Sequence, residues 1–420
     1  MIAYDACGRE GRSVRRRRRR TISWAAALLQ GRRKMVGHSG EARRSGPRRC
    51  NSVATRADRS CGVSLSIRPQ RGLTAWRMCA VLVLAVFVAA AGLLTVPVAT
   101  AAFSVITSST ATWSAVENFG VGRLFAWGDN GSGQLGVGDR TDRRSPTQAG
   151  SATSWTRIAV GRSHTCGRQT TGILWCSGSN FYGQLGLGNT TDTTTHAQVG
   201  TATSWARVVA GENHTCATWG NGALRCWGRN NAGQLGLGDT ANRSAPVQVG
   251  TDNGWVAPAA GAEHTCAVRR QRTLWCWGNN ASGQLGLGDT ATRTAPVQVG
   301  TDNTWVAPAA GAAHSCAVRK DRTLWCWGNN ASGQLGLGDT VNRSSPVQVG
   351  TDNTWVSVTA GSAHTCAVGA VQAVWCWGNN ASGQLGLGDT ATRTAPTLVP
   401  GTRGRPIATG PTASSVLLVV

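Results

Sequence analysis

Ten of the 14 cysteines fall into five pairs, and a histidine precedes each pair. The two cysteines are ten residues apart, and the histidine lies two residues before the first of them. Imidazole and thiolate are both zinc ligands, but a tetrahedral zinc site needs a further ligand or an open position. Two sulfurs can instead form a disulfide. The pairs are Cys166 and Cys176, Cys216 and Cys226, Cys266 and Cys276, Cys316 and Cys326, and Cys366 and Cys376, and the histidines are His164, His214, His264, His314 and His364.

The spacing favours disulfides over both zinc sites and free buried thiols. A turn midway between the cysteines makes them face each other in an antiparallel hairpin, with Cα atoms about 4.5–5.5 Å apart, which a disulfide can span. The first hairpin has Val116 and Ala126 at the matching positions, so both cysteines are missing together. No further acid or histidine recurs nearby. We predict five disulfides and no metal, with each histidine hydrogen-bonded to backbone. Gly178, opposite His164, leaves room for the imidazole.

No other constellation points to catalysis. We find no Ser/His/acid set, paired carboxylates or cofactor fingerprint that departs from the repeat pattern. The recurring Gly-Gln-Leu-Gly loop lacks the Lys-Ser/Thr of a P-loop and opens no helix. Its single aspartate is too little for a calcium site. That aspartate recurs four residues before an arginine, as in Asp239 with Arg243 and Asp289 with Arg293, which predicts a local ion pair. We therefore predict a protein that is not an enzyme and has no cofactor.

The elements that position these residues repeat every 50 residues. Gly-Gln-Leu-Gly begins at 134, 184, 234, 284, 334 and 384. Within a unit, short runs rich in Val, Trp, Leu and Thr are bounded by Gly, Asn, Asp and Pro, which is typical of strands joined by turns. Four short strands in about 50 residues make one blade of a β-propeller. The chain is therefore predicted to be all-β.

The repeated motif resembles a known family. Trp-Gly-x-Asn-x-x-Gly-Gln-Leu-Gly-x-Gly-Asp, a Pro-Val strand and Ala-Gly-x-x-His-Thr are similar to the regulator of chromosome condensation repeat, whose bacterial members are often labelled alpha-tubulin-suppressor-like. The resemblance covers about 112–418 and implies a β-propeller, commonly seven-bladed. Six full units start near residues 124, 174, 224, 274, 324 and 374, so six blades stay possible. Thr112–Glu117, Ile407–Ala408 and Ser414–Val419 are expected to supply the closure.

Two segments precede the propeller, which we place at 102–420. Residues 1–72 form a basic leader that is predicted to be disordered, and one interpretation is that the mature protein lacks it. Residues 73–101 have the positive, apolar and small-residue parts of a signal peptide, with cleavage expected after Ala101; an uncleaved signal anchor is the alternative. Residues 1–77 carry a net charge of +16 and residues 102–420 only +7, so nucleic acid is disfavoured as a partner.

The hairpin tips differ from unit to unit and are the predicted contact surface. Such loops commonly carry binding residues above a rigid scaffold. Arg269, Arg270, Arg272, Arg319, Lys320 and Arg322 fall on neighbouring blades and form either a basic patch for an acidic partner or merely solvated turns. The recurring tryptophans are expected to pack between blades rather than bind sugars.

These features favour a secreted or surface-bound monomer that binds a protein or an envelope glycan and touches membrane only through its apolar segment. The resemblance offers two alternatives. One is guanine-nucleotide exchange on a small GTPase, which export disfavours. The other is inhibition of a secreted enzyme, as in the propeller-type β-lactamase inhibitor protein.

Overall fold

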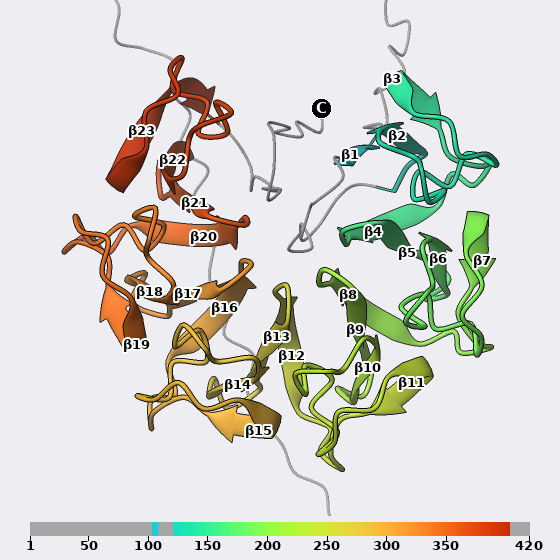
Figure 1. Cartoon of the computed structure of the whole chain (residues 1–420), viewed down its shortest axis with the longest axis horizontal. Coiled ribbons are helices and arrows are strands. Elements are labelled where there is room, and N and C mark those ends of the chain that lie inside the picture. The colour runs from blue at the N-terminus through green and yellow to red at the C-terminus, as the bar shows by residue number, and fades with distance from the viewer. Residues whose placement is uncertain (1–102, 108–120, 404–420) are drawn as a thin grey trace, which may run out of the picture. The chain divides into compact units, whose positions relative to one another are not determined.

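The computed structural model describes residues 103–107 and 121–403, all within one compact unit, Val86–Val420. The leader at 1–72 and the signal segment at 73–101 lie outside the described residues. The described residues form strands and no helix, in six sheets that we number as blades 1 to 6 (Figure 1).

Blade 1 has three strands, and blades 2 to 6 have four each, paired in chain order. Blade 1 contains β1 (Phe103–Thr107), β2 (Leu124–Gly128) and β3 (Arg143–Gln148). Blades 2 and 3 contain β4 (Trp155–Val160), β5 (His164–Gln169), β6 (Leu174–Gly178), β7 (Thr193–Gln198), β8 (Trp205–Ala210), β9 (His214–Trp219), β10 (Leu224–Gly228) and β11 (Arg243–Gln248). Blades 4 and 5 contain β12 (Trp255–Ala260), β13 (His264–Arg269), β14 (Leu274–Gly278), β15 (Arg293–Gln298), β16 (Trp305–Ala310), β17 (His314–Arg319), β18 (Leu324–Gly328) and β19 (Arg343–Gln348). Blade 6 contains β20 (Trp355–Ala360), β21 (His364–Gly369), β22 (Ala373–Gly378) and β23 (Arg393–Arg403).

The sequence units and the blades are out of phase by two strands. A unit that starts at Leu174 supplies β6 and β7 to blade 2 and then β8 and β9 to blade 3. The first strands of neighbouring four-stranded blades contact one another, β4 with β8, β8 with β12, β12 with β16 and β16 with β20. Figure 1 shows these strands nearest the middle of the arrangement. Each unit therefore ties two blades together covalently.

Hydrophobic cores lie between blades. In one cluster, Leu224, Leu235 and Val249 of blade 3 pack with Trp255 and Trp277 of blade 4. Strand alternation explains which residues reach it: in β14, Trp275 and Trp277 pack in this cluster, whereas Leu274 and Cys276 face the cluster shared with blade 5. The recurring tryptophans thus pack at junctions, as predicted.

The first blade differs from the expected hairpin. β1 runs parallel to β2 and places Val105, not Val116, opposite Ala126. Our assignment of Thr112–Glu117 as the strand beside β2 was therefore wrong. Residues 108–120 and 404–420, which include the rest of the predicted closure, lie outside the described residues. The six described sheets agree with the six full units of the sequence.

The connections fall on two faces. The β5–β6 hairpin tips and the links from one blade to the next lie at one end of the strands, which we call the tip face. The β4–β5 turns and the long β6–β7 loops lie at the other end, which we call the loop face. Equivalent segments of the other blades follow the same pattern. Across residues 103–107 and 121–403, the structure has no helix long and apolar enough to cross a membrane.

Candidate functional site

All five predicted cysteine pairs are disulfide-bonded, and in each the two Cα atoms are 4.1 Å apart. This distance is slightly shorter than the expected 4.5–5.5 Å, and the register places the two cysteines of each pair directly opposite each other. The prediction of disulfides is confirmed for every pair: Cys166 with Cys176, Cys216 with Cys226, Cys266 with Cys276, Cys316 with Cys326, and Cys366 with Cys376.

The hairpin register also places His164 opposite Gly178, as the spacing indicated. Gly178 has a φ of 107°, and a Cβ there would lie 2.8 Å from the His164 Cα, so no larger residue fits. In the part of the chain that the structure describes, no three His, Cys, Asp or Glu side chains gather as metal ligands.

The repeated histidines connect successive blades. Nε2 of His164 lies 2.9 Å from the hydroxyl of Thr215, and Nε2 of His214 lies 3.0 Å from that of Thr265. The Thr215 hydroxyl donates to the Gln184 carbonyl at 2.8 Å, so it accepts from the imidazole N–H. His264 and His314 make the same contact with Ser315 and Thr365. The predicted backbone partner was therefore wrong: the hydroxyl lies within reach because the next blade packs against this strand.

Burial keeps these histidines uncharged. It lowers the pKa of His164, His264 and His364 from 6.5 to about 4. In His214 and His314, desolvation and then the neighbouring histidines lower the pKa to about 3. A neutral ring that bridges two blades is a structural element.

The Gly-rich loops of the loop face are held by an asparagine that the sequence reasoning missed. Asn280 Nδ2 donates to the carbonyl and to the carboxylate of Asp289, and Asn280 Oδ1 accepts from Leu285 N at 2.9 Å. Asp289 pairs with Arg293 at 2.6 Å, which confirms the predicted ion pair. The signal was available, because an asparagine recurs at this place in all six units, at 130, 180, 230, 280, 330 and 380.

The six candidate partner-binding residues divide into two groups. Arg270, Arg272, Lys320 and Arg322 are exposed at the hairpin tips of blades 4 and 5. Arg272 and Arg322 have φ of 62° and 64°, and their carbonyls accept hydrogen bonds from Trp305 N and Trp355 N, both 3.1 Å, in the next blade. Their side chains remain available, while their backbone fastens one blade to the next.

Arg269 and Arg319 are instead held inside the blades. The Arg319 guanidinium lies 4.4 Å from the Trp305 ring centre and 4.0 Å from that of Trp325, and it pairs with Asp302 at 2.5 Å. Arg269 has the same arrangement with Trp255, Trp275 and Asp252. These two arginines contribute to blade packing.

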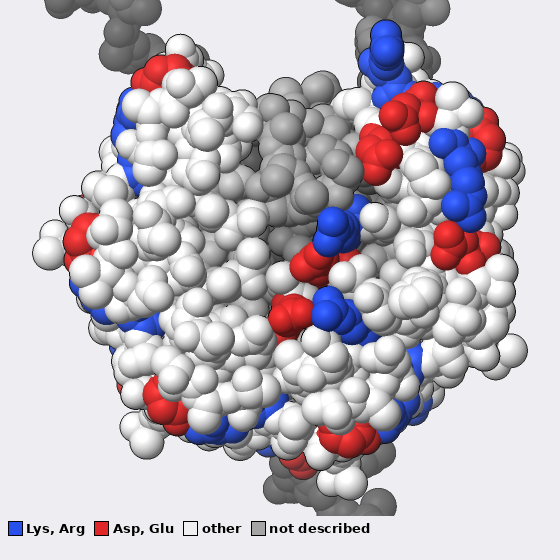
Figure 2. Space-filling model, in the orientation of Figure 1, with Lys and Arg blue, Asp and Glu red and all other residues white. Residues whose placement is uncertain are grey.

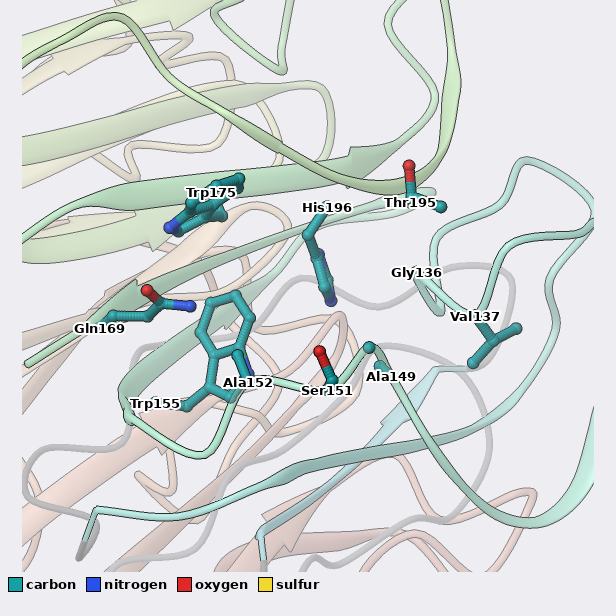
Figure 3. Close-up of a pocket in the computed structure, with 11 residues that line it drawn as sticks. Gly136, Val137, Ala149, Ser151, Ala152, Trp155, Gln169, Trp175, Thr195 and His196 are labelled. Carbon is teal, nitrogen blue, oxygen red and sulfur yellow. The ribbon is translucent and has the colours of Figure 1, made fainter.

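A cavity of about 380 Å³ lies at the junction of blades 1 and 2, lined by residues of the β2–β3 loop, of the link before β4, and of β4 to β7 (Figure 3). Trp155, Trp175, Gln169, Ser151 and His196 line it, and Figure 3 shows the His196 ring pointing between Trp155 and Gly136. The equivalent place in blade 5 is a cavity of about 430 Å³ that contains the arginine arrangement just described.

The cavity lacks such an occupant because blade 2 departs from the repeat. Ser177 stands where blades 3 to 6 have a tryptophan, at 227, 277, 327 and 377. His196 replaces a proline and fills part of that space, with its ring 5.1 Å from that of Trp155. Gln169 and Ala152 replace the arginine and the aspartate of blade 5.

This junction also leaves polar atoms unsatisfied. The hydroxyls of Thr165 and Ser177 and both ring nitrogens of His196 are buried without a hydrogen-bond partner among the described residues. Burial lowers the His196 pKa to about 4. The lining contains no carboxylate, lysine or arginine. A neutral imidazole without an acid or nucleophile beside it can accept or donate a hydrogen bond to a ligand, which fits binding rather than catalysis.

Ion pairs that cross from blade to blade on the loop face lie over blades 1 to 4. Ion pairs cross between blades there: Arg162 with Glu212 at 2.6 Å, Arg229 with Glu263 at 3.1 Å and Arg140 with Asp192 at 3.1 Å. Figure 2 shows paired positive and negative side chains near the middle on that side, and a largely uncharged surface over blades 5 and 6 away from the rim. The matching turn residues in those blades are Ala312, Ala313, Ser362 and Ala363.

Comparison with known proteins agrees with this architecture. The model of the RCC1-like domain matches residues 194–418, and models of the Regulator of chromosome condensation (RCC1) repeat match 121–167 and 155–184. No curated protein sequence matches this chain significantly.

Solved structures with a similar fold share little sequence with it. Human WBSCR16 is 21% identical with a TM-score of 0.62, covering 73% of this chain and 82% of its own. A chain in the crystal structure of Kap60 bound to yeast RCC1 (Prp20) is 21% identical with a TM-score of 0.60, covering 71% of this chain and 75% of its own. Identity at this level shows the fold alone. Together with a domain match over more than half of the chain, the repeated blades show that this protein belongs to the RCC1-like domain family.

Proposed function

We propose that this chain is an exported, non-catalytic β-propeller scaffold that binds a protein or a glycan through its tip face. One observation carries the proposal. The buried histidines, cysteines and asparagines are engaged in contacts that repeat from blade to blade, whereas the exposed tips differ. Variable residues on a constant frame are what a binding surface requires.

We infer that the chain is non-catalytic because the described blades do not add a set of catalytic residues to the repeat. A catalytic site needs residues in one place that the other blades lack. Within the described residues, the clearest such departure is the junction of blades 1 and 2, and its lining offers a neutral histidine with no acid. The likeness to yeast RCC1 supports the scaffold and says nothing about nucleotide exchange by this chain.

Two features support export and an acidic partner. Disulfides persist in oxidising compartments outside the cytosol, and five of them join strands here. The exposed tip cations Arg270, Arg272, Lys320 and Arg322 belong to neighbouring blades. A cluster of positive charges attracts a negatively charged partner and increases the rate of association. We therefore expect an acidic protein surface or an anionic glycan.

The test compares two double charge reversals in the full chain. Arg270→Glu with Lys320→Glu removes positive charge from the tip face. Arg123→Glu with Arg144→Glu makes the same change in net charge in blade 1. The measurement is the NaCl concentration at which each protein elutes from heparin and from immobilised polyglutamate. Since the basic leader is identical in both, a difference reports the tips.

The tip variant should elute at clearly lower salt than the blade 1 variant on at least one of the two matrices. Equal elution of both variants from both matrices would show that the tips do not recognise anionic partners.

A further inference from the structure

The site that holds Arg269 and Arg319 recurs in the blades with different occupants. In blades 4 and 5 it consists of a tryptophan that starts the first strand, a second tryptophan on the third strand, an aspartate in the preceding link and the arginine that ends the second strand. The tryptophan ring centres are 6.4 Å apart in both blades, at interplanar angles of 82° and 79°. The guanidinium contacts both rings and the carboxylate.

Blade 3 shows that the contact between cation and aromatic ring is itself maintained. There the two residue types are exchanged between strands, with Trp219 in place of the arginine and Arg225 in place of the second tryptophan. The Arg225 guanidinium lies 4.0 Å from the Trp219 ring centre. Two independent sequence solutions in one chain thus place an arginine at this site. The attraction arises because the face of an indole ring carries partial negative charge.

Blade 6 retains every part of the site except the arginine. Trp355 and Trp375 have ring centres 6.3 Å apart at 77°, matching the occupied sites. Asp352 is exposed in the preceding link, and none of the ion pairs among the described residues includes it. Gly369 stands where blades 4 and 5 have Arg269 and Arg319. Among the described residues, no guanidinium lies over either ring.

We propose that Trp355, Trp375 and Asp352 bind the guanidinium group of an arginine side chain presented by a partner protein. This inference rests on the proposed scaffold function and names the chemistry of one contact on its tip face. The ligand would take the place that the chain's own arginine takes in blades 4 and 5. A planar guanidinium can stack on both indoles and pair with the carboxylate, whereas the compact ammonium of lysine matches this geometry less well.

Blade 2 provides a contrast within the same chain. Gln169 and Ala152 replace both the arginine and the aspartate there, so its tryptophans have no carboxylate beside them. An entering cation would gain no ion pair at that site. Blade 6 is the four-stranded blade in which the aspartate is present and the arginine is absent.

The chain offers a substitution that fills the site from within. A Cβ at Gly369 would meet its nearest neighbours, Ala373 O, Thr354 Oγ1 and Trp375 Nε1, at 3.9 Å, which is ordinary contact. The φ of Gly369 is not in the left-handed region, so a side chain causes no backbone strain. Gly369→Arg should therefore recreate the arrangement of Arg319. Ala370→Arg adds the same charge at the next, exposed position and is the matched control.

The measurement is saturation-transfer difference NMR on the full chain with the peptide acetyl-Gly-Arg-Gly-amide. Matched peptides contain citrulline, which has nearly the same shape without charge, or lysine. We expect transfer to the arginine side chain in the unchanged protein and in Ala370→Arg, with weak affinity, about millimolar. Gly369→Arg should abolish the transfer while melting at no lower temperature. Asp352→Asn should weaken binding about two- to fivefold.

Three results would overturn the proposal: no transfer to the arginine peptide, equal transfer to the citrulline peptide, or undiminished transfer in both Gly369→Arg and Asp352→Asn. The variant Arg403→Gln tests whether an arginine of the same chain occupies the tryptophan pair of blade 6. Residue 403 is chosen because its backbone pairs with Ala373, on the same strand as Trp375. Binding seen only in Arg403→Gln would show that the chain fills its own site, which also overturns it. None of these outcomes bears on the elution of the tip variants, so a failure here is distinguishable from a failure of the scaffold function.

Discussion

Neutral imidazoles join the blades, and this makes the protein sensitive to acid. Each bridging histidine donates from Nε2 to a hydroxyl of the next blade, and burial opposes its protonation. The folded protein therefore binds protons at these rings only near pH 3 to 4. The unfolded chain binds them near the ordinary pKa of 6.5.

Stability should consequently fall as the pH is lowered from about 6.5 towards about 4. Across that window the unfolded state holds more protons than the folded state, so stability rises with pH, by about 1.4 kcal/mol per pH unit for each histidine. Melting temperatures measured between pH 7.5 and pH 4.5, without reductant, check this expectation.

The loop carboxylates contribute little to the change in melting temperature between pH 6.5 and 4.5. The pKa of Asp289 is lowered from 3.8, mainly by the Ala291 backbone N–H, with Arg293 contributing. Its contribution is therefore present above 3.8 and is lost only in stronger acid. A melting temperature that stays constant or rises between pH 6.5 and 4.5 would contradict the role given to the histidines.

Each disulfide closes a short hairpin loop, because its two cysteines are ten positions apart in the sequence. Replacing Cys266 and Cys276 together by alanine should lower the free energy of unfolding by about 2 kcal/mol or less, because a short loop loses little entropy when it is closed. Urea unfolding of the variant and of the unchanged protein measures the difference. The single replacement Cys266→Ala is the control that leaves one free thiol. A loss well above about 3 kcal/mol would mean that the bond does more than restrict the unfolded hairpin.

Among the elements, the junction between blades 1 and 2 lacks an indole hydrogen bond that the later junctions have. In blades 3 to 6 the Trp227-type indole donates to the carbonyl of the preceding loop, as Trp277 does to Gln234 at 3.0 Å. Ser177 cannot reach that place, and its hydroxyl and that of Thr165 have no partner among the described residues. A cavity and unmatched polar groups both reduce stability.

Restoring the repeat at this junction should stabilise the fold. Ser177→Trp combined with His196→Pro places an indole where blades 3 to 6 have one and removes a buried histidine. We expect the free energy of unfolding to rise by about 0.5–2 kcal/mol, as cavity-filling changes commonly achieve.

The reverse change in blade 4, Trp277→Ser, is the matched control and should cost about 3–5 kcal/mol. Thermal melting ranks the three proteins. A restored variant that melts below the unchanged protein would show that the blade 2 residues are adapted to one another.

At the scale of the whole molecule, the two-strand offset between sequence units and blades determines how the blades are connected. Each unit ends one blade and begins the next, so adjacent blades share covalent links, the histidine bridges and a common core. Deleting one complete unit would remove strands from two blades at once.

Export is the main prediction at this scale, and intact mass tests it. Protein from culture medium and from membranes is alkylated before and after reduction. We expect a chain that begins at Ala102, with all ten paired cysteines reacting only after reduction. A full-length chain retained in the cell, with freely reacting thiols, would contradict export. It would also show that the basic leader is part of the mature protein and is available to bind a partner inside the cell.

Local patterns sufficed for much of the fold. The strands, the blade, the cysteine register and the Asp/Arg pairs of the loops all depend on residues within a single unit, so spacing alone predicts them. The position of Arg269 and Arg319 could not be predicted in this way. Hairpin spacing places them at a tip, but their side chains turn back onto Trp255 and Trp305, which lie on another strand. The role of His196 could not be predicted either. It fills space left where Ser177 replaces the tryptophan of the other blades, and Ser177 is 19 positions away in the sequence.

By itself the sequence determined the all-β architecture, the family and the pairing of cysteines, because these follow from a strict period and from alternation within short strands. Only the tertiary structure decided what lies across a junction: the hydroxyl that accepts from each bridging histidine, the parallel β1 beside β2, and the tryptophan pair of blade 6, over which no guanidinium of the described residues lies. Those contacts join residues about 20 to 50 positions apart on separate blades or strands, and their geometry depends on how the sheets pack rather than on any local pattern.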